Sequence, residues 1–374
     1  MIYLDCAATT LQKPPAVAAA MEDALETLAS PGRGGHPAAM QAAAVAFRCR
    51  EALAELFRVQ GPEQVVFTQN ATHALNIALK SLVGQGSRVV ISGYEHNAVT
   101  RPLAALRVRA AVAAAPLFQP WAVVEAYDRL LRAGADAAVC CHVSNVFGFV
   151  QPVEEIAALC RRYQVPLIVD ASQSAGVVPL DMEALGAAFI AMPGHKGLYG
   201  PQGTGVLLCG KGTAVRPLLE GGTGSESLRQ EMPEFLPDRL EAGTHNMPGI
   251  AGLLAGVRYV AERGTGMICR RERELAQIAA EGLRAIPGIQ VSAAPGLSAQ
   301  AGVVSFTVDG RDVEAVGAAL AERDIAVRAG LHCAPLAHRT GGTLATGTVR
   351  ASFSDFNTPE EARRLVEAVR ALYP

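Results

Sequence analysis

The chain has 374 residues, of which 50% are hydrophobic and 18% are charged, and its formal net charge is −2. This size and composition are typical of a globular protein with one large domain and a smaller one. Because lysine and arginine are scattered and balanced by acidic residues, the composition disfavours nucleic acids and anionic membranes as main partners and favours a small molecule.

The first residues, MIYLDCAATT, lack the basic region and apolar core of a signal peptide, and no uninterrupted apolar stretch is long enough to span a bilayer. We therefore expect a cytoplasmic protein. Its eight cysteines show no CxxC motif and no regular spacing, so reduced thiols are expected rather than a disulfide framework or a metal site.

Two alanine-rich helices are predicted before the first strand, at 15–28 and 39–57. The loop between them contains Arg33 and His36, which either line a site or lie on a solvated surface. From residue 64 onward, short apolar runs alternate with segments of helical periodicity. This alternation indicates a mostly parallel sheet covered by helices.

Polar residues follow the predicted strands of this sheet. The strands are expected at 64–68, 88–92, 136–143 and 165–170, and the polar residues after them are Thr72, His96, Asn145, Asp170 and Gln173. Ligands of open α/β sheets bind beyond the carboxyl ends of the strands, so we expect these side chains in one crevice. Each of them taken alone could instead be a structural cap.

Ala71 and Thr72 begin the helix that is predicted after the first of these strands. The free backbone amides, the hydroxyl and the helix dipole at such a terminus suit a phosphate. The alternative is that Thr72 only caps the helix.

Lys196 lies in the segment AFIAMPGHKGLYGPQGTG, 188–205, where a short apolar run ends and glycines begin. This pattern indicates a buried strand that delivers one lysine into a cleft, with glycines that let a planar ligand approach the backbone. A partly desolvated lysine has a lowered pKa and can hold an aldehyde as a Schiff base. The alternative is a solvated lysine on a glycine-rich turn.

The second half of the chain begins with a long turn-rich segment, 221–246, which we expect to lie over a site or at a subunit contact. We place the domain boundary near Gly264, and predict a large α/β domain over 15–264 and a small α+β domain formed by 1–14 and 265–374. Helices are predicted at 247–264, 270–286, 312–323 and from Thr358 onward, and strands at 288–292, 302–308, 325–330 and 348–353. The small domain carries Cys333, on a loop expected to be exposed with His332, and Arg350.

The order of the segments YLDCAATT, IVDASQSAG, GHKGLYGPQGTG, EAGTHN, RAGLHCAP and VRASFSDFNT resembles the fold-type I, pyridoxal-phosphate-dependent class V aminotransferases, and within them the cysteine desulfurases. The resemblance covers nearly the whole chain. It implies an α/β fold with a mostly parallel, seven-stranded-type sheet and a smaller C-terminal α+β domain. It also implies pyridoxal 5'-phosphate as cofactor, an amino-acid substrate, a homodimer and a separate sulfur-acceptor protein.

The resemblance assigns the cofactor ring to one group of residues. Lys196 matches the lysine that carries the cofactor, and His96 matches the residue that stacks on its ring. Asp170 resembles the partner of the ring nitrogen, with Asn145 and Gln173 near the ring hydroxyl.

The remaining roles concern the phosphate, the substrate and the sulfur. Thr72 and His195, together with the amide of Ala71, resemble phosphate ligands, and Thr244 resembles a threonine that the other subunit of a dimer supplies. Arg350 matches the arginine that holds the substrate carboxylate, with Asn145 beside it. Cys333 matches the cysteine that receives sulfur as a persulfide.

Three positions depart from the family pattern. Pro193 stands where a phosphate-binding serine is usual, so one hydrogen bond must come from elsewhere, and Cys6 stands where asparagine is common. The segment between Cys333 and Arg350 is short, as in desulfurases that need a separate acceptor. No docking tail is expected after the last helix, near Pro374.

Other functions compatible with these residues are a selenocysteine lyase or another class V lyase or aminotransferase. A non-enzymatic alternative is a cofactor-binding sulfur carrier or regulatory protein, although such a protein has no chemical need of both Cys333 and Arg350. A nicotinamide-dependent dehydrogenase is disfavoured, because no GxGxxG motif opens a helix after the first strand.

Overall fold

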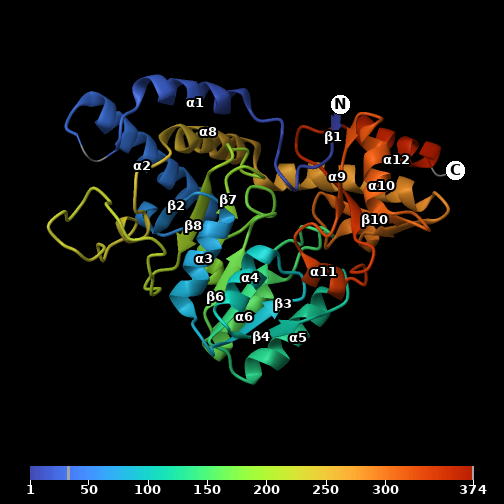
Figure 1. Cartoon of the computed structure of the whole chain (residues 1–374), viewed down its shortest axis with the longest axis horizontal. Coiled ribbons are helices and arrows are strands. Elements are labelled where there is room, and N and C mark those ends of the chain that lie inside the picture. The colour runs from blue at the N-terminus through green and yellow to red at the C-terminus, as the bar shows by residue number, and fades with distance from the viewer. Residues whose placement is uncertain (32–33, 373–374) are drawn as a thin grey trace.

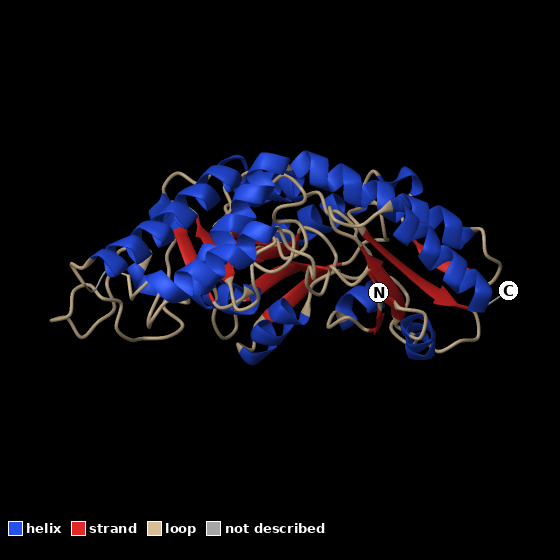
Figure 2. Ribbon diagram, turned by 90° about the horizontal axis from the view of Figure 1, so that it is seen from above, coloured by secondary structure: helices blue, strands red, loops and turns tan. Residues whose placement is uncertain are grey.

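The computed structural model describes residues 1–31 and 34–372. Arg33 and Pro374 therefore lie outside the described residues. Figures 1 and 2 show an elongated molecule in which the strands of two sheets lie in separate halves, with the larger sheet in the half formed by the first two thirds of the chain.

The large sheet has seven strands in the order β2-β8-β7-β6-β5-β3-β4. β8 runs antiparallel to the other six strands, which are parallel to one another. The prediction of a mostly parallel, seven-stranded sheet is confirmed. The strands are β2 (Val65–Thr68), β3 (Arg88–Ser92), β4 (Arg109–Ala113), β5 (Ala137–Cys141), β6 (Leu167–Asp170), β7 (Phe189–Pro193) and β8 (Gly205–Cys209).

Helices cover both faces of this sheet (Figure 1). Val66 and Val89 pack with α3 and α4 on one face, whereas Val65 and Val90 pack with α2, α5, α6 and α8 on the other. Successive residues of a strand point to opposite faces, so a strand buried on both sides is apolar throughout. The helices are α1 (Pro15–Thr27), α2 (Pro37–Phe57), α3 (Ala71–Leu82), α4 (Asn97–Ala105), α5 (Pro120–Arg132), α6 (Val153–Tyr163), α7 (Met182–Leu185) and α8 (Met247–Arg263).

Two strands of the large sheet, β4 and β8, were not predicted from the sequence patterns. β4 forms the edge of the sheet and is mostly exposed, so its alanines and arginine carry no strong apolar signal. β8 begins at Gly205, within the glycines that follow Lys196, although all five of its residues are buried. A side chain at Gly205 would collide with the backbone of Asn70, which explains the glycine.

The second sheet is antiparallel, with the order β12-β13-β10-β9, and it has its own apolar core. The first strand of the chain joins this half, because β1 (Ile2–Tyr3) pairs with β11 (Ile325–Ala326). The other strands are β9 (Ile289–Ser292), β10 (Val303–Val308), β12 (Arg328–Gly330) and β13 (Thr348–Ser352). The helices are α9 (Thr265–Arg284), α10 (Val313–Ala321), α11 (Pro335–Thr340) and α12 (Pro359–Leu372).

The start of α12 confirms its sequence signal. The amide of Glu361 donates to the hydroxyl of Thr358, and the amide of Thr358 donates to the Glu361 carboxylate at 2.8 Å. This reciprocal pair is a capping box. Among the described residues, no helix is long and apolar enough to cross a membrane.

The long segment 221–246 contains only one short helical turn, Asp238–Leu240, among its residues. Its end is fixed by Glu241, whose carboxylate forms a bidentate ion pair with Arg50 at 2.6 and 2.8 Å and accepts the amide of Phe67. Both charged side chains are buried. The segment is therefore anchored to α2 through a buried ion pair and to β2 through the amide of Phe67.

Candidate active site

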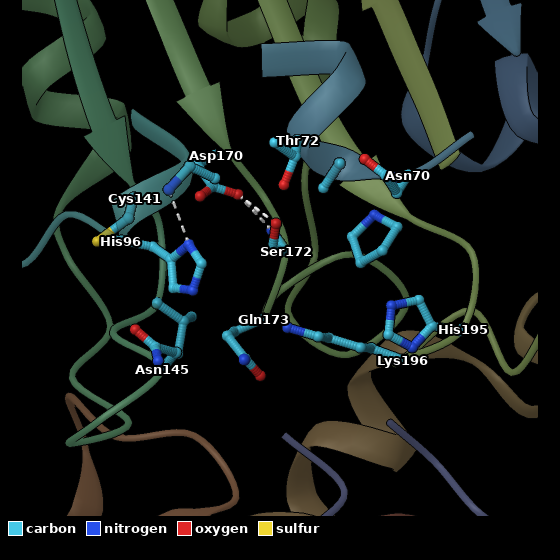
Figure 3. Close-up of a pocket in the computed structure, with 14 residues that line it drawn as sticks. Asn70, Thr72, His96, Cys141, Asn145, Asp170, Ser172, Gln173, His195 and Lys196 are labelled. Carbon is cyan, nitrogen blue, oxygen red and sulfur yellow. Dashed lines mark hydrogen bonds between the residues drawn. The ribbon is translucent and has the colours of Figure 1, made fainter. Parts of the chain in front are cut away.

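A cavity of about 590 Å³ opens where the strands of the large sheet end (Figure 3). The structure brings together there most of the side chains that the sequence suggested. They are Ala71, Thr72, His96, Asn145, Asp170, Gln173, His195 and Lys196, joined by Asn70, Cys141, Ser172 and Pro193. The expectation that polar residues after several strands share one crevice is confirmed.

Lys196 follows β7 and is half-buried in the cavity wall. Burial, reinforced by the charge of Arg350, lowers the pKa of its amine to about 8. The hydroxyl of Thr10 lies within hydrogen-bond distance of the backbone oxygens of His195 (3.0 Å) and Lys196 (3.2 Å), so the N-terminal segment holds the turn. A solvated lysine on a free turn, the alternative considered above, does not describe this residue.

The glycines beside Lys196 make room for the chain itself. A Cβ atom at Gly197 would lie 2.5 Å from the carbonyl oxygen of Ala175. At this position the close neighbour is therefore protein backbone, whereas the sequence suggested a ligand.

Asp170 ends β6 at the wall of the cavity. One of its carboxylate oxygens, Oδ1, accepts the amide of Ser172 at 2.9 Å and also the Ser172 hydroxyl (Figure 3). These bonds fix the carboxylate and leave Oδ2 available to a donor on a ligand. An aromatic nitrogen that must stay protonated is such a donor.

His96 precedes α4 and caps it, because its Nδ1 accepts the amide of Ala98 at 3.0 Å. A ring nitrogen that accepts a hydrogen bond carries no proton, so the proton of the neutral ring lies on Nε2. Burial lowers the pKa of His96 and outweighs the opposing effect of Asp170. The cavity is thus lined by a neutral imidazole with a fixed orientation.

The N-terminus of α3 is capped by Asn70, whose Oδ1 accepts the amide of His73 at 2.9 Å. The alternative that Thr72 caps the helix is therefore wrong. The Thr72 hydroxyl and the first amides of α3 lie at the cavity and are not used by the helix, whose first turn has no intrahelical acceptors for them. This end of the cavity suits an anion.

Two further residues border the same end. His195 lies 3.0 Å through its Nδ1 from the hydroxyl of Thr9, and burial lowers its pKa to about 4, so the ring is neutral. Pro193 lines the cavity but has no donor to offer.

Arg350, on β13, is only 1% exposed and adjoins the cavity through Asn145. Its Nη2 donates to Asp5 Oδ1 at 2.6 Å and its Nη1 to the backbone oxygen of Asn145 at 2.9 Å. Its Nε is buried without a partner in the described chain. A planar cation with an unused buried donor suits a carboxylate ligand.

Cys333 is exposed, whereas the other seven cysteines are buried, and all eight belong to the described residues. The backbone oxygen of Cys333 accepts a hydrogen bond from the amide of Asn97 at 2.9 Å, which places Cys333 beside His96. His332, which was expected on the exposed loop, is instead buried, because its ring bonds to Thr348 on β13.

Thr244 does not line this cavity. It is exposed and borders a separate cavity of about 740 Å³ next to Gly203 and Gly205. Within one chain, the structure does not bring Thr244 to Lys196.

Sequence reasoning did not identify Asn70, Ser172 and Asp5 as residues of the site. Asn70 and Ser172 had local signals, since asparagine often caps a following helix and a serine two residues after an aspartate often bonds to it. Asp5 had none, because its pairing with Arg350 joins the two ends of the chain.

Comparisons with known proteins extend over the whole chain. The family model for class-V aminotransferases matches residues 2–365. A probable cysteine desulfurase from Methanothermobacter thermautotrophicus is 33% identical, covering 99% of this chain and 94% of that protein. A cysteine desulfurase from Klebsiella pneumoniae is also 33% identical, covering 100% and 93%. The apo structure of a cysteine desulfurase from Thermococcus onnurineus NA1 has a TM-score of 0.90 at 31% identity, covering 100% and 94%.

Proposed function

Because this chain belongs to the class-V aminotransferase family, we propose that it is a pyridoxal-phosphate-dependent cysteine desulfurase. It converts L-cysteine into L-alanine and takes the sulfur onto Cys333 as a persulfide. The observation that carries the proposal is the convergence of the half-buried Lys196, the fixed Asp170 and the buried Arg350 around one cavity, with an exposed cysteine beside it.

The residues of the cavity fit the cofactor. Its aldehyde would bind at Lys196, whose lowered pKa leaves part of the amine neutral near neutral pH. Its ring nitrogen would meet the free oxygen of Asp170, and its phosphate would meet Thr72 and the first amides of α3. The cofactor supplies an electron sink for the bonds that break at the substrate.

Pro193 has no donor for the phosphate, which leaves two sources of side-chain donors besides Thr72. His195 offers a ring donor when its Nδ1 accepts from Thr9, because the proton then lies on Nε2. Thr244 of a second subunit is the other source, because it is exposed and does not reach the cavity within one chain. We therefore include a homodimer with shared sites in the proposal.

The protein's own groups divide the remaining work. The Arg350 guanidinium orients the substrate by its carboxylate, with Asn145 beside it. The Nζ atom of Lys196 removes and returns protons at the substrate Cα. His96, neutral with its proton on Nε2, lies at the cavity as a hydrogen-bond donor.

Cys333 completes the reaction. Its sulfur forms an S–S bond with the substrate sulfur while the substrate Cβ–S bond breaks, and the electron pair of that bond ends in a new C–H bond of alanine. One cysteine and one thiol thus give one alanine and one persulfide. The exposed position of Cys333 lets a sulfur-acceptor protein collect the persulfide, as in iron–sulfur cluster assembly.

The test is to incubate the purified protein with cysteine, selenocysteine and cysteine sulfinate, and to quantify alanine from each. We expect alanine from cysteine, and a persulfide on Cys333 by mass spectrometry. Cys333→Ser should keep the cofactor but lose at least a thousandfold in alanine production from cysteine. Preferred release from selenocysteine would indicate a selenocysteine lyase instead, and cofactor binding without alanine would indicate a carrier or regulatory protein.

A further inference from the structure

Arg328 is a charged residue of the site that the proposed reaction does not yet use. It lies on β12, opposite Arg350 in the pairing of β12 with β13. Its side chain is half-buried, and no carboxylate of the described residues forms an ion pair with it. Its Nη2 instead donates to the Sγ atom of Cys333, at 3.9 Å.

Several basic groups lie around Arg328. Arg328 contributes to the lowered pKa of four basic groups, namely His96, Lys196, His332 and Arg350. The Glu314 carboxylate of α10 lies beside Gly330 of the same strand but forms no ion pair with Arg328. The acidic groups of the site are engaged elsewhere, since Asp5 pairs with Arg350 and Asp170 bonds to Ser172. A half-buried cation without a counter-ion favours negative charge at the atom that it touches.

The turn that carries Cys333 is held firmly against this cation. His332 and Cys333 both have left-handed backbones, with φ of 48° and 57°, which are unfavourable for residues with side chains. The large domain fixes both peptide oxygens, because Asn145 Nδ2 donates to His332 at 2.8 Å and the Asn97 amide donates to Cys333 at 2.9 Å. The direction of the Cys333 side chain is therefore set by the fold.

We propose that Arg328 is a catalytic residue that stabilises negative charge on the sulfur of Cys333. It favours the thiolate, which is the form that attacks the substrate sulfur, and then the anionic terminal sulfur of the persulfide. The thiol proton leaves to solvent, and the guanidinium stays protonated throughout because arginine does not titrate in proteins. This inference rests on the proposed function, in which Cys333 accepts the sulfur.

The first arm of the test measures alkylation of Cys333 by the neutral reagent iodoacetamide in the purified full-length holoenzyme. The buried cysteines react slowly, so the labelled Cys333 peptide can be quantified by mass spectrometry. Arg328→Gln should be alkylated about fivefold more slowly at pH 7, and Arg328→Lys should recover most of the rate. At pH 10, where free thiols are ionised, the rates should converge. The control Arg339→Gln removes an exposed charge of α11 and should match the wild type.

Two outcomes overturn the inference: an unchanged rate for Arg328→Gln at pH 7, or a slower rate that persists at pH 10, which would indicate altered access. If Arg328→Gln does not fold, the inference can be tested on the wild type by adding salt, which screens the charge of Arg328. High salt should then slow the alkylation of Cys333 at pH 7 but not at pH 10. The second arm measures alanine in a single turnover, where Arg328→Gln should be slower and Arg328→Lys intermediate. If the wild type makes no alanine, the desulfurase proposal fails, and the alkylation arm still reports on the Arg328–Cys333 pair.

Discussion

Replacing Lys196 with methionine should stabilise the apo-protein. A charged amine is disfavoured in the cavity wall, and burial with the charge of Arg350 lowers its pKa from 10.5 to about 8. At about 1.36 kcal/mol for each tenfold change in proton affinity, this lowering corresponds to about 3 kcal/mol of lost stability while the amine is charged. Methionine has a similar length and no charge, so Lys196→Met removes this loss.

The pH dependence separates the charge from packing. Below the folded-state pKa of about 8, both states hold the proton and the loss is complete. As the pH rises from 8 to 10.5, the folded state releases the proton first, so the stability of the wild type rises and the loss disappears. The advantage of Lys196→Met should therefore fall from about 3 kcal/mol at pH 7 to about 1 kcal/mol at pH 9.5.

The assay is equilibrium urea unfolding of both apo-proteins at each pH, followed by circular dichroism. The other titrating groups are common to both proteins, so their contributions cancel when the two free energies of unfolding are subtracted. Lys211→Met, at an exposed lysine, serves as the control and should show little change at either pH. If the advantage of Lys196→Met is the same at pH 7 and pH 9.5, or absent at pH 7, the buried charge is not the cause.

Three further stability changes follow from buried charges, each measured by the same unfolding assay. Burial raises the pKa of Glu95 from 4.5 to about 7, so the wild type loses stability as the pH rises through this range. Glu95→Gln should therefore be about 3 kcal/mol more stable than the wild type at pH 8, but hardly more stable at pH 4.5. An equal gain in stability at both pH values would refute this explanation. Arg50→Met removes the guanidinium that pairs with the buried Glu241 carboxylate, which keeps its contacts with His245 and the Phe67 amide, and should cost about 3–5 kcal/mol. The double variant Arg50→Met with Glu241→Gln should recover a part of this cost, and no recovery would point to packing. Asp5→Asn should cost about 3 kcal/mol by leaving Arg350 uncompensated, and an unchanged stability would show that the pair is unimportant.

Local signals account for much of the site. The strand before Lys196, the helix start at Ala71 and Thr72, and the acidic end of β6 at Asp170 all had patterns within a few residues. The parallel order of the strands then placed their ends together. Family resemblance supplied the roles of Cys333 and Arg350, which no local pattern assigns.

Local patterns were less informative where neighbours in space decide the outcome. The edge strand β4 is exposed and lacks an apolar signal, and β8 is hidden among glycines that pack against backbone. His332 was expected on an exposed loop, but its ring is buried against Thr348, which is distant in sequence.

The sequence by itself determined the sheet type, most helices and the identity of the groups around Lys196, because these depend on periodicity and on the ends of neighbouring strands. Only the tertiary structure decided the charge balance of the site. Asp5 reaches Arg350 across almost the whole chain, and Arg328 meets the sulfur of Cys333 because a left-handed turn is held by Asn97 and Asn145. Electrostatic interactions depend on distance and burial in space, and a linear pattern of residues specifies neither.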